Sequence, residues 1–308
     1  MKCLVSKEAF LGLDPQDAVS YENAKAVIIP FGLEQSVSYG RGTFKGPTAM
    51  IQASREVELF DEALWREPYR DIGIVTLEEP KLENNMLKAL QQLEGLVERV
   101  LEDKKFPFVF GGEHSITAGS IRPFVKRHSN LEILHFDAHA DLRDRYHGEH
   151  FSHASVIRRC LDHSNIEVVS VGIRNISAEE IPFFEANQNR IHIYWAKDKK
   201  NWDFKKIIAP LKNRPIYLTF DVDGFDASLM PATGTPEPDG LLWNDALEII
   251  SAASQVGTIV GADINELAPI PYFHSCDFLA AKLAYKILSL AFFRGGASVS
   301  LSCDALFY

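Results

Sequence analysis

Six short apolar segments, separated by longer segments with helical periodicity, constrain the fold of this chain most. They are rich in β-branched and aromatic residues, and they do not alternate between apolar and polar positions. That pattern is typical of strands covered on both faces. The segments span residues 26–30, 106–110, 131–136, 168–171, 215–220 and 258–262.

Helical patterns lie between these segments. In residues 82–102, apolar side chains recur near the 3.6-residue spacing of one helix face. Residues 243–256 show the same pattern, with Asn244 as a candidate N-cap, and residues 278–293 indicate a final buried helix. A strand followed by a helix about six times over predicts an α/β fold with a parallel sheet. Because no linker rich in Pro, Gly or Ser divides the chain, we expect one domain over residues 1–308.

Charge and cysteine content exclude several classes of protein. The chain carries 32 basic and 42 acidic residues, a formal net charge of −10, which argues against a nucleic-acid or anionic-membrane surface. Cys3, Cys160, Cys276 and Cys303 form no C-x-x-C pair, so we expect free, reduced thiols. The N-terminus lacks the apolar core of a secretory signal, and residues 287–293 are too short to span a bilayer. These features predict a soluble cytoplasmic protein.

Acidic and histidine residues follow four of the predicted strands. Ligands of parallel α/β sheets bind at the carboxyl edge, where such residues gather. We therefore expect the chemistry of the protein there. The four segments are GGEHS at 111–115, DAHAD at 137–141, DVDG at 221–224 and DINE at 263–266.

Asp137, His139 and Asp141 are the strongest candidates for metal ligands. In an extended segment, side chains at i, i+2 and i+4 share one side. Three titratable groups side by side would repel one another unless a cation lay among them. The alternative is a polar turn that caps the next helix.

Asp221 and Asp223 repeat this spacing after another strand, although acidic loops are common at such positions. His114 taken alone would be a structural histidine more often than a ligand. The Gly111–Gly112 pair before it permits a close backbone approach, and Ser115 can cap a following helix.

Together these positions supply four carboxylates and two imidazoles, a set that balances two divalent cations. Carboxylate-rich mixed sites suit Mn²⁺, whereas structural zinc prefers thiolates. Paired metals generate a hydroxide nucleophile from water at neutral pH. The pattern predicts a two-metal hydrolase, and no Walker loop, Rossmann glycine motif or G-x-S-x-G elbow competes with it.

Several of these motifs resemble those of the ureohydrolases, the arginase and agmatinase family. The resemblance runs from about residue 25 to 290 and includes GGEHS, DAHADLRD, FDVDGFD, PATGTPEPDGL, DINELAP and the early loop at 38–47. It implies a three-layer α/β/α fold with a mostly parallel central sheet. It also implies two Mn²⁺ ions per chain and hydrolysis of a guanidinium group to urea and an amine by a metal-bridging hydroxide. The ligands it implies are those indicated by spacing: His114, Asp137, His139, Asp141, Asp221 and Asp223.

The resemblance also assigns catalytic roles. Glu266 matches the substrate-orienting glutamate of the family, and a carboxylate pairs bidentately with a guanidinium; the alternative is a surface loop residue. His153 matches the proton-shuttling histidine, a role that suits imidazole. His147 and His150 are either exposed loop residues or alternative shuttles. Glu113 stands where the family often has Asp, a change expected to be harmless because the residue is not a ligand.

The loop at 142–150 limits the choice of substrate. Arginases use a loop with Asn and Ser to hold the amino-acid head of arginine, and this loop contains no Asn. The resemblance favours agmatinase activity, which yields putrescine for polyamine biosynthesis and urea. Arg143 or Arg145 could instead bind a carboxylate, as in arginine, guanidinobutyrate or formiminoglutamate, unless both pair with Asp144 and Glu149. A longer pocket would admit aminopropylagmatine.

Two other classes of protein stay open from the sequence alone. One is a one-zinc amide deacetylase, although the chain has no His-His pair; the other is a binding protein that has lost catalysis. Two manganese ions, one zinc ion or no metal per chain would distinguish the three. The resemblance also implies a homo-oligomer, a trimer or hexamer, acting on a small cationic guanidino substrate.

Overall fold

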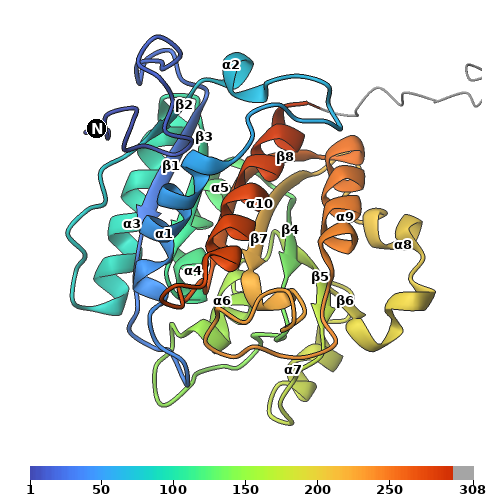
Figure 1. Cartoon of the computed structure of the whole chain (residues 1–308). Helices are drawn as coiled ribbons and strands as arrows, with labels where there is room; N and C mark the ends of the chain where they lie inside the picture. The colour runs from blue at the N-terminus through green and yellow to red at the C-terminus, as the bar shows by residue number, and fades with distance from the viewer. Residues whose placement is uncertain (294–308) are drawn as a thin grey trace, which may run out of the picture.

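The computed structural model describes residues 1–293, and residues 294–308, with Cys303, lie outside the described part. Within that part, eight strands form one sheet in the order β2-β1-β3-β8-β7-β4-β5-β6 (Figure 1). Every strand pairing in the sheet is parallel. The α/β fold with a parallel sheet is therefore confirmed, and the prediction of a single domain over 1–308 stays a prediction.

The strands are β1 (Ala26–Phe31), β2 (Ile74–Thr76), β3 (Phe106–Gly111), β4 (Leu131–Phe136), β5 (Ile166–Ile173), β6 (Ile191–Trp195), β7 (Pro215–Asp221) and β8 (Thr258–Asn265). The α-helices are α1 (Gly46–Ala53), α2 (Pro68–Ile72), α3 (Met86–Glu102), α4 (Thr117–Ser120), α5 (Arg122–Arg127), α6 (Val156–Leu161), α7 (Ile181–Ala186), α8 (Phe204–Ile208), α9 (Trp243–Val256) and α10 (His274–Phe292).

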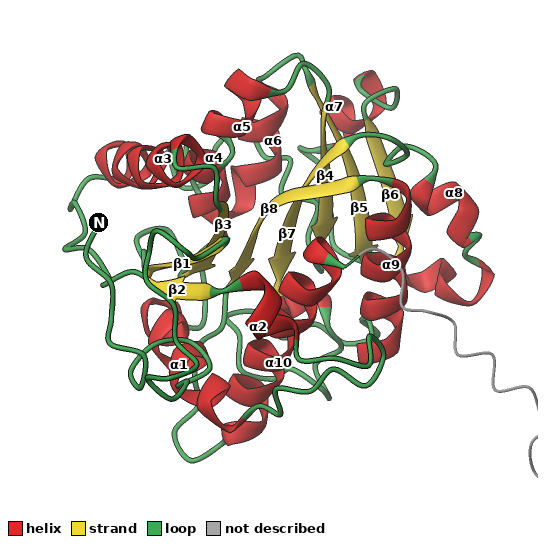
Figure 2. Cartoon of the chain, turned by 90° about the horizontal axis from the view of Figure 1, so that it is seen from above, coloured by secondary structure: helices red, strands yellow, loops and turns green. Residues whose placement is uncertain are grey.

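Helices cover both faces of the sheet, which gives the three layers that the family resemblance implied (Figure 2). Helices α3, α4, α5 and α6 pack on one face, where their apolar side chains form one core cluster with residues such as Val109 and Ile133. Helices α1, α8, α9 and α10 pack on the other face against Phe108, Leu134 and Leu218. Since the strands are covered on both sides, their residues are apolar without alternation.

All six predicted strands are present, and two further strands were not predicted. Strand β2 has only three residues, and β6 is a half-buried edge strand that includes His192. The prediction of Asn244 as an N-cap was wrong. The N-cap of α9 is Leu242, two residues before Asn244, and the Asp245 side chain accepts a hydrogen bond from the backbone N–H of Leu242.

Glu132, in β4, is a buried carboxyl at the end of the sheet opposite the strand termini that carry the acidic loops. Its side chain has no exposed surface, and neither of its carboxyl oxygens has a hydrogen-bond partner. Strand register places it between Glu167 of β5 and Ile216 of β7. Burial, followed by the charge of Glu167, raises the pKa of Glu132 to about 8, and Arg214 opposes the rise.

The three predicted helices are present with shifted ends: α3 begins four residues later than residue 82, and α10 begins four residues earlier than residue 278. Cys3, Cys160 and Cys276 are free. Among the described residues, no helix combines the length and apolar character that crossing a membrane requires.

Candidate metal centre and catalytic site

The four adjacent strands β3, β8, β7 and β4 end at one edge of the sheet, and the loops after them line a cavity together with the loops after β1 and β5. Its volume is about 350 Å³. His114, Asp141 and Asp223 line it, together with His153 and Glu266. The residues that follow these strands thus come together at the carboxyl edge, because parallel strands deliver their final residues to one place.

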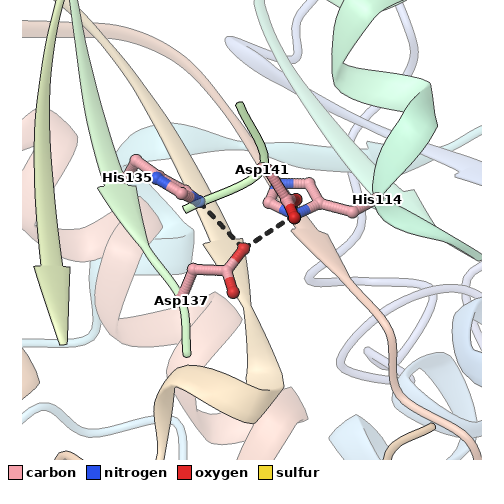
Figure 3. Close-up of side chains that lie close together, drawn as sticks. All are labelled: His114, His135, Asp137 and Asp141. Carbon is pink, nitrogen blue, oxygen red and sulfur yellow. Dashed lines mark hydrogen bonds and ion pairs between the residues drawn. The ribbon is translucent and has the colours of Figure 1, made fainter. Parts of the chain in front are cut away.

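Around His114 lies the first of two groups able to hold a metal ion. His114 is in the 3₁₀ turn η3 (His114–Ile116) after β3, and its Nδ1 lies 3.0 Å from Asp137 Oδ2 and 3.3 Å from Oδ2 of Asp141 and of Asp221. Its Nε2 lies 2.9 Å from Thr219 Oγ1. The group consists of His114, His135, Asp137 and Asp141, and Figure 3 shows these four side chains close together, with His114 and His135 on opposite sides of Asp137.

The second group consists of Asp137, His139 and Asp223. His139 Nδ1 lies 3.0 Å from Asp223 Oδ2 and 3.5 Å from Asp137 Oδ1. Asp137 therefore belongs to both groups, with one carboxylate oxygen directed to each. This sharing fits a pair of ions held close together.

The surroundings of His114 Nδ1 indicate that this set of donor atoms suits a divalent cation. His114 Nδ1 is buried and has no hydrogen-bond partner, although three carboxylate oxygens face it. Burial, and then the charge of Asp137, raises the pKa of Asp141 to about 7. Burial and the charge of Asp223 likewise raise the pKa of Asp221 well above its usual value. A cation among these groups would favour the charged carboxylates and so offset both the effect of burial and the repulsion between them.

Backbone geometry at these positions differs from the extended segment that the sequence analysis assumed. Strand β4 ends at Phe136, so Asp137, His139 and Asp141 lie in a loop and not on one side of a strand. Asp141 has φ +54°, and Glu266, just after β8, has φ +65°. Positive φ is costly for non-glycine residues and persists where the surroundings enforce it, often at functional sites.

Gly112 permits the close approach expected of the glycine pair. A Cβ there would collide with the backbone carbonyl of Leu33, which follows β1. The backbone N–H of Glu113 donates to that carbonyl at 2.7 Å. Only glycine therefore lets the loop after β3 lie against the loop after β1.

Glu266 lies within the cavity wall and not on the surface. It is 7% exposed, and its Oε1 accepts a hydrogen bond of 2.6 Å from the backbone N–H of His114. Burial and the charge of Glu113 raise its pKa well above the usual value. The bond to His114 ties Glu266 to the first metal group.

His153 also lines the cavity, in the 3₁₀ turn η4 (His153–Ser155) after β4. Burial, then the charges of His139 and His114, lowers its pKa to about 4, so the ring is neutral at pH 7. Its Nδ1 lies 3.2 Å from Ser36 Oγ. Ser36 in turn donates to the buried Glu113 at 2.8 Å.

Three expectations about nearby polar residues can now be compared with their positions. Ser115 does not cap a helix, because its hydroxyl donates instead to Glu113. His147 and His150 are exposed and do not line the cavity, and His150 Nε2 contacts Arg159 at 2.6 Å.

The two arginines of the loop behave differently from each other. Arg145 pairs with Asp144 at 3.5 Å, as one alternative supposed. Arg143, which lines the cavity, pairs with Glu179 and not with Asp144 or Glu149, and its guanidinium lies 5.3 Å from the Tyr146 ring. Arg143 is therefore already engaged by a carboxylate.

Sequence reasoning missed two parts of the site. His135 Nε2 lies 2.9 Å from Asp137 Oδ2, and its Nδ1 lies 3.0 Å from Ser170 Oγ. The available signal was a histidine at the end of a predicted strand, two residues before Asp137, the first candidate ligand after that strand. The loop after β5 was also missed, although Asn175 and Glu180 line the cavity; no strand-end pattern marked them.

Comparison with known proteins agrees with this geometry. Residues 24–289 match the model of the arginase family. The chain is 35% identical to an N(1)-aminopropylagmatine ureohydrolase of Synechocystis sp. over 90% of this chain and 92% of that protein. It is 34% identical to an agmatinase of Bacillus cereus over 83% and 87%. The crystal structure of agmatine ureohydrolase of Thermoplasma volcanium superimposes with a TM-score of 0.81 and 31% identity, covering 94% of this chain and 95% of that one.

Arginase-family enzymes are hydrolases that use a binuclear metal site, and two largely buried His/Asp groups able to hold a metal ion lie at the carboxyl edge of this parallel sheet. The chain belongs to the arginase family. It is a ureohydrolase, an enzyme that hydrolyses C–N bonds of guanidino compounds.

Proposed function

We propose that this enzyme hydrolyses a linear guanidino compound whose far end is a cationic amine, with agmatine as the first candidate and putrescine and urea as products. The observation that carries the proposal is the carboxylate of Glu180 in the cavity wall. Glu180 is 4% exposed, and no lysine or arginine within residues 1–293 forms an ion pair with it.

The hydrogen bonds of Glu180 leave its charge without a counterion. It accepts from the backbone N–H of Leu142 at 2.7 Å, and from the backbone N–H and hydroxyl of Ser177 at 2.6 and 2.7 Å. These are neutral donors. An ammonium group of the substrate would supply the missing opposite charge, in a partly desolvated site where such a pairing is strong.

Substrates with a carboxylate at the far end fit this wall less well. The loop at 142–150 has no Asn of the kind with which arginases hold the amino-acid head, so the carboxylate of arginine, guanidinobutyrate or formiminoglutamate would be bound best by a free cationic side chain in the cavity. Arg143 is the arginine that lines it, and Glu179 already pairs with that residue. The free charge in the wall is thus negative.

Aminopropylagmatine is a second candidate, because the relative from Synechocystis sp. is named for that substrate. It differs from agmatine by a longer amine tail, so the charge argument applies to both compounds.

The proposed ligands of the two ions are the six residues predicted from the sequence: His114, Asp137, His139, Asp141, Asp221 and Asp223. We propose Mn²⁺ on the basis of this carboxylate-rich donor set. When bound, two divalent ions supply a nucleophilic water at neutral pH.

The protein's own groups perform the remaining steps. Glu266 pairs with the guanidinium and holds its carbon in the cavity. Water adds to that carbon, and the C–N bond to the alkyl chain breaks. His153 carries the proton that the departing amine requires, which leaves urea and an amine as products.

Urea release measured on agmatine, aminopropylagmatine, arginine, guanidinobutyrate and formiminoglutamate tests the substrate. The proposal expects kcat/KM to be highest for one of the two amine substrates. A higher kcat/KM for any carboxylate substrate would contradict it.

A charge-selective variant tests the role of Glu180. Glu180→Gln is expected to raise KM for agmatine about 10-fold and to leave KM for butylguanidine, which has no amine, within about twofold. The exposed Glu185→Gln on α7 serves as the control and should change neither value. An equal change in KM for both compounds would show that Glu180 does not interact with the charged amine of the substrate.

A further inference from the structure

We propose that Ser36 and Glu113 are positioning residues that fix the tautomer of His153, with the proton on Nδ1 and Nε2 left available for proton transfer in the cavity. The inference rests on the role of His153 given under Proposed function. It gives Glu113 a role in catalysis, although Glu113 is not one of the proposed metal ligands.

Glu113 accepts four hydrogen bonds in a fully buried position. Its Oε2 accepts from the backbone N–H groups of Gln35 and Ser36, each at 2.6 Å. Its Oε1 accepts from the hydroxyls of Ser36 at 2.8 Å and Ser115 at 2.6 Å. A carboxylate has about four lone-pair positions, so all are in use. A proton on this carboxyl would displace one of the four donors.

The hydroxyl of Ser36 has a single hydrogen, and Glu113 takes it. Ser36 Oγ can then only accept from its other neighbours. One of these is the backbone N–H of His153 at 3.0 Å. The other is the His153 ring, whose Nδ1 lies 3.2 Å away and must therefore be the donor.

A neutral imidazole with its hydrogen on Nδ1 has its lone pair on Nε2. Across residues 1–293, no hydrogen bond involves Nε2 of His153, and the residue lines the cavity. Nε2 is thus the ring atom free to accept a proton and return it to the leaving amine. Tautomer control by a hydrogen-bonded neighbour is a known requirement of histidine catalysis.

The three residues come from three different loops. Ser36 follows β1, Glu113 follows β3, and His153 is in the long loop after β4. The close approach of the first two loops at Gly112 brings Ser36 to Glu113. No motif in a single stretch of sequence could therefore reveal the arrangement.

Ser36→Ala removes the hydroxyl and tests the proposal through kinetics on the preferred substrate. We expect kcat to fall about 10-fold, KM to stay within about twofold, and metal content to equal that of the wild type. Ser36→Thr keeps the hydroxyl at a half-buried position and is expected to retain most of the activity. The exposed Ser164→Ala is the control and should leave kcat unchanged.

A double-mutant cycle with His153→Ala separates this inference from the proposed function. We expect His153→Ala to lower kcat about 100-fold with both metals retained, and Ser36→Ala to cause no further loss in that background. Wild-type kcat in His153→Ala would refute the proposed role of His153 and the inference with it. Wild-type kcat in Ser36→Ala, or a further 10-fold loss in the double variant, would overturn the inference alone.

Glu113→Gln provides a second test if Ser36→Ala fails to fold. The amide N–H₂ donates where a carboxylate oxygen accepted, which frees the Ser36 hydrogen to bond Nδ1 and favours the wrong tautomer. We expect kcat to fall about 10-fold at full metal content. Unchanged kcat with both metals bound would contradict the proposed hydrogen-bond relay.

Discussion

The buried, unpartnered Glu132 makes the stability of this protein depend on pH in a predictable direction. The test is the Glu132→Gln variant, which keeps the shape of the side chain and removes its ability to ionise. The folded-state pKa is about 8, against a usual value of 4.5. Below pH 4.5 the carboxyl is protonated in both states and contributes no pH dependence. Between pH 4.5 and 8 the unfolded chain ionises while the folded chain retains its proton, so stability falls as pH rises.

The magnitude follows from the interval between the two pKa values. Each pKa unit corresponds to about 1.4 kcal/mol, so the full interval corresponds to about 5 kcal/mol. Between pH 5 and pH 8, wild-type stability should fall by about 3 kcal/mol more than that of the variant. The groups facing Glu132 from neighbouring elements are Glu167 on β5, which favours the rise, and Arg214 before β7, which opposes it.

Urea denaturation of both proteins at several pH values between 5 and 8, with metal held constant, measures this difference. The variant and the wild type should diverge steadily as pH rises. Glu102→Gln, at the exposed end of α3, is the control and should follow the wild type at every pH. A constant difference between Glu132→Gln and the wild type across this range would show that Glu132 ionises equally in both states, and the reasoning would be wrong.

Three further predictions concern the metal centre and the backbone beneath it. Asp137→Asn should reduce metal content from two ions to fewer than one per chain and abolish urea release, because both groups share Asp137; elemental analysis showing two ions retained would contradict this. Chelation should lower the melting temperature and added Mn²⁺ should restore it, because a ligand at 100 times its Kd stabilises the folded state by about 2.7 kcal/mol. An unchanged melting temperature after verified metal removal would refute the expected coupling between metal binding and folding. Gly112→Ala should lower the free energy of unfolding in urea by at least about 2 kcal/mol, because the added Cβ collides with the carbonyl of Leu33. Gly95→Ala in α3, where an added Cβ meets nothing, is the control and should not destabilise the protein. Equal urea midpoints for the two variants would count against the collision.

Strands inside the sheet could be predicted from sequence, and strands at its edges could not. β1, β3, β4, β5, β7 and β8 have neighbours on both sides and are covered on both faces, so continuous apolar runs mark them. β2 and β6 are the edge strands. β2 is too short to form a run, and the partial exposure of β6 permits polar residues such as His192.

At the site, the sequence located residues that follow strands but not those that support them. His114 and Asp137 were singled out because acidic and histidine residues that follow strands at the carboxyl edge are typical of ligand sites. His135 lies within β4 and was counted among its apolar residues. The positions of Ser36 and Glu180 in the site depend on contacts between loops that are distant in sequence, and local sequence patterns do not predict such contacts.

With the roles proposed for Glu266 and Glu180, the order of the strands would separate the reacting end of the substrate from its tail. The metal groups and Glu266 follow the adjacent strands β3, β8, β7 and β4, whereas Glu180 follows β5, farther towards the edge. We therefore expect substitutions in the loop after β5 to alter which tail is accepted without displacing the proposed metal ligands. Such an arrangement lets enzymes with one reaction diverge in substrate over evolution by changing a single loop.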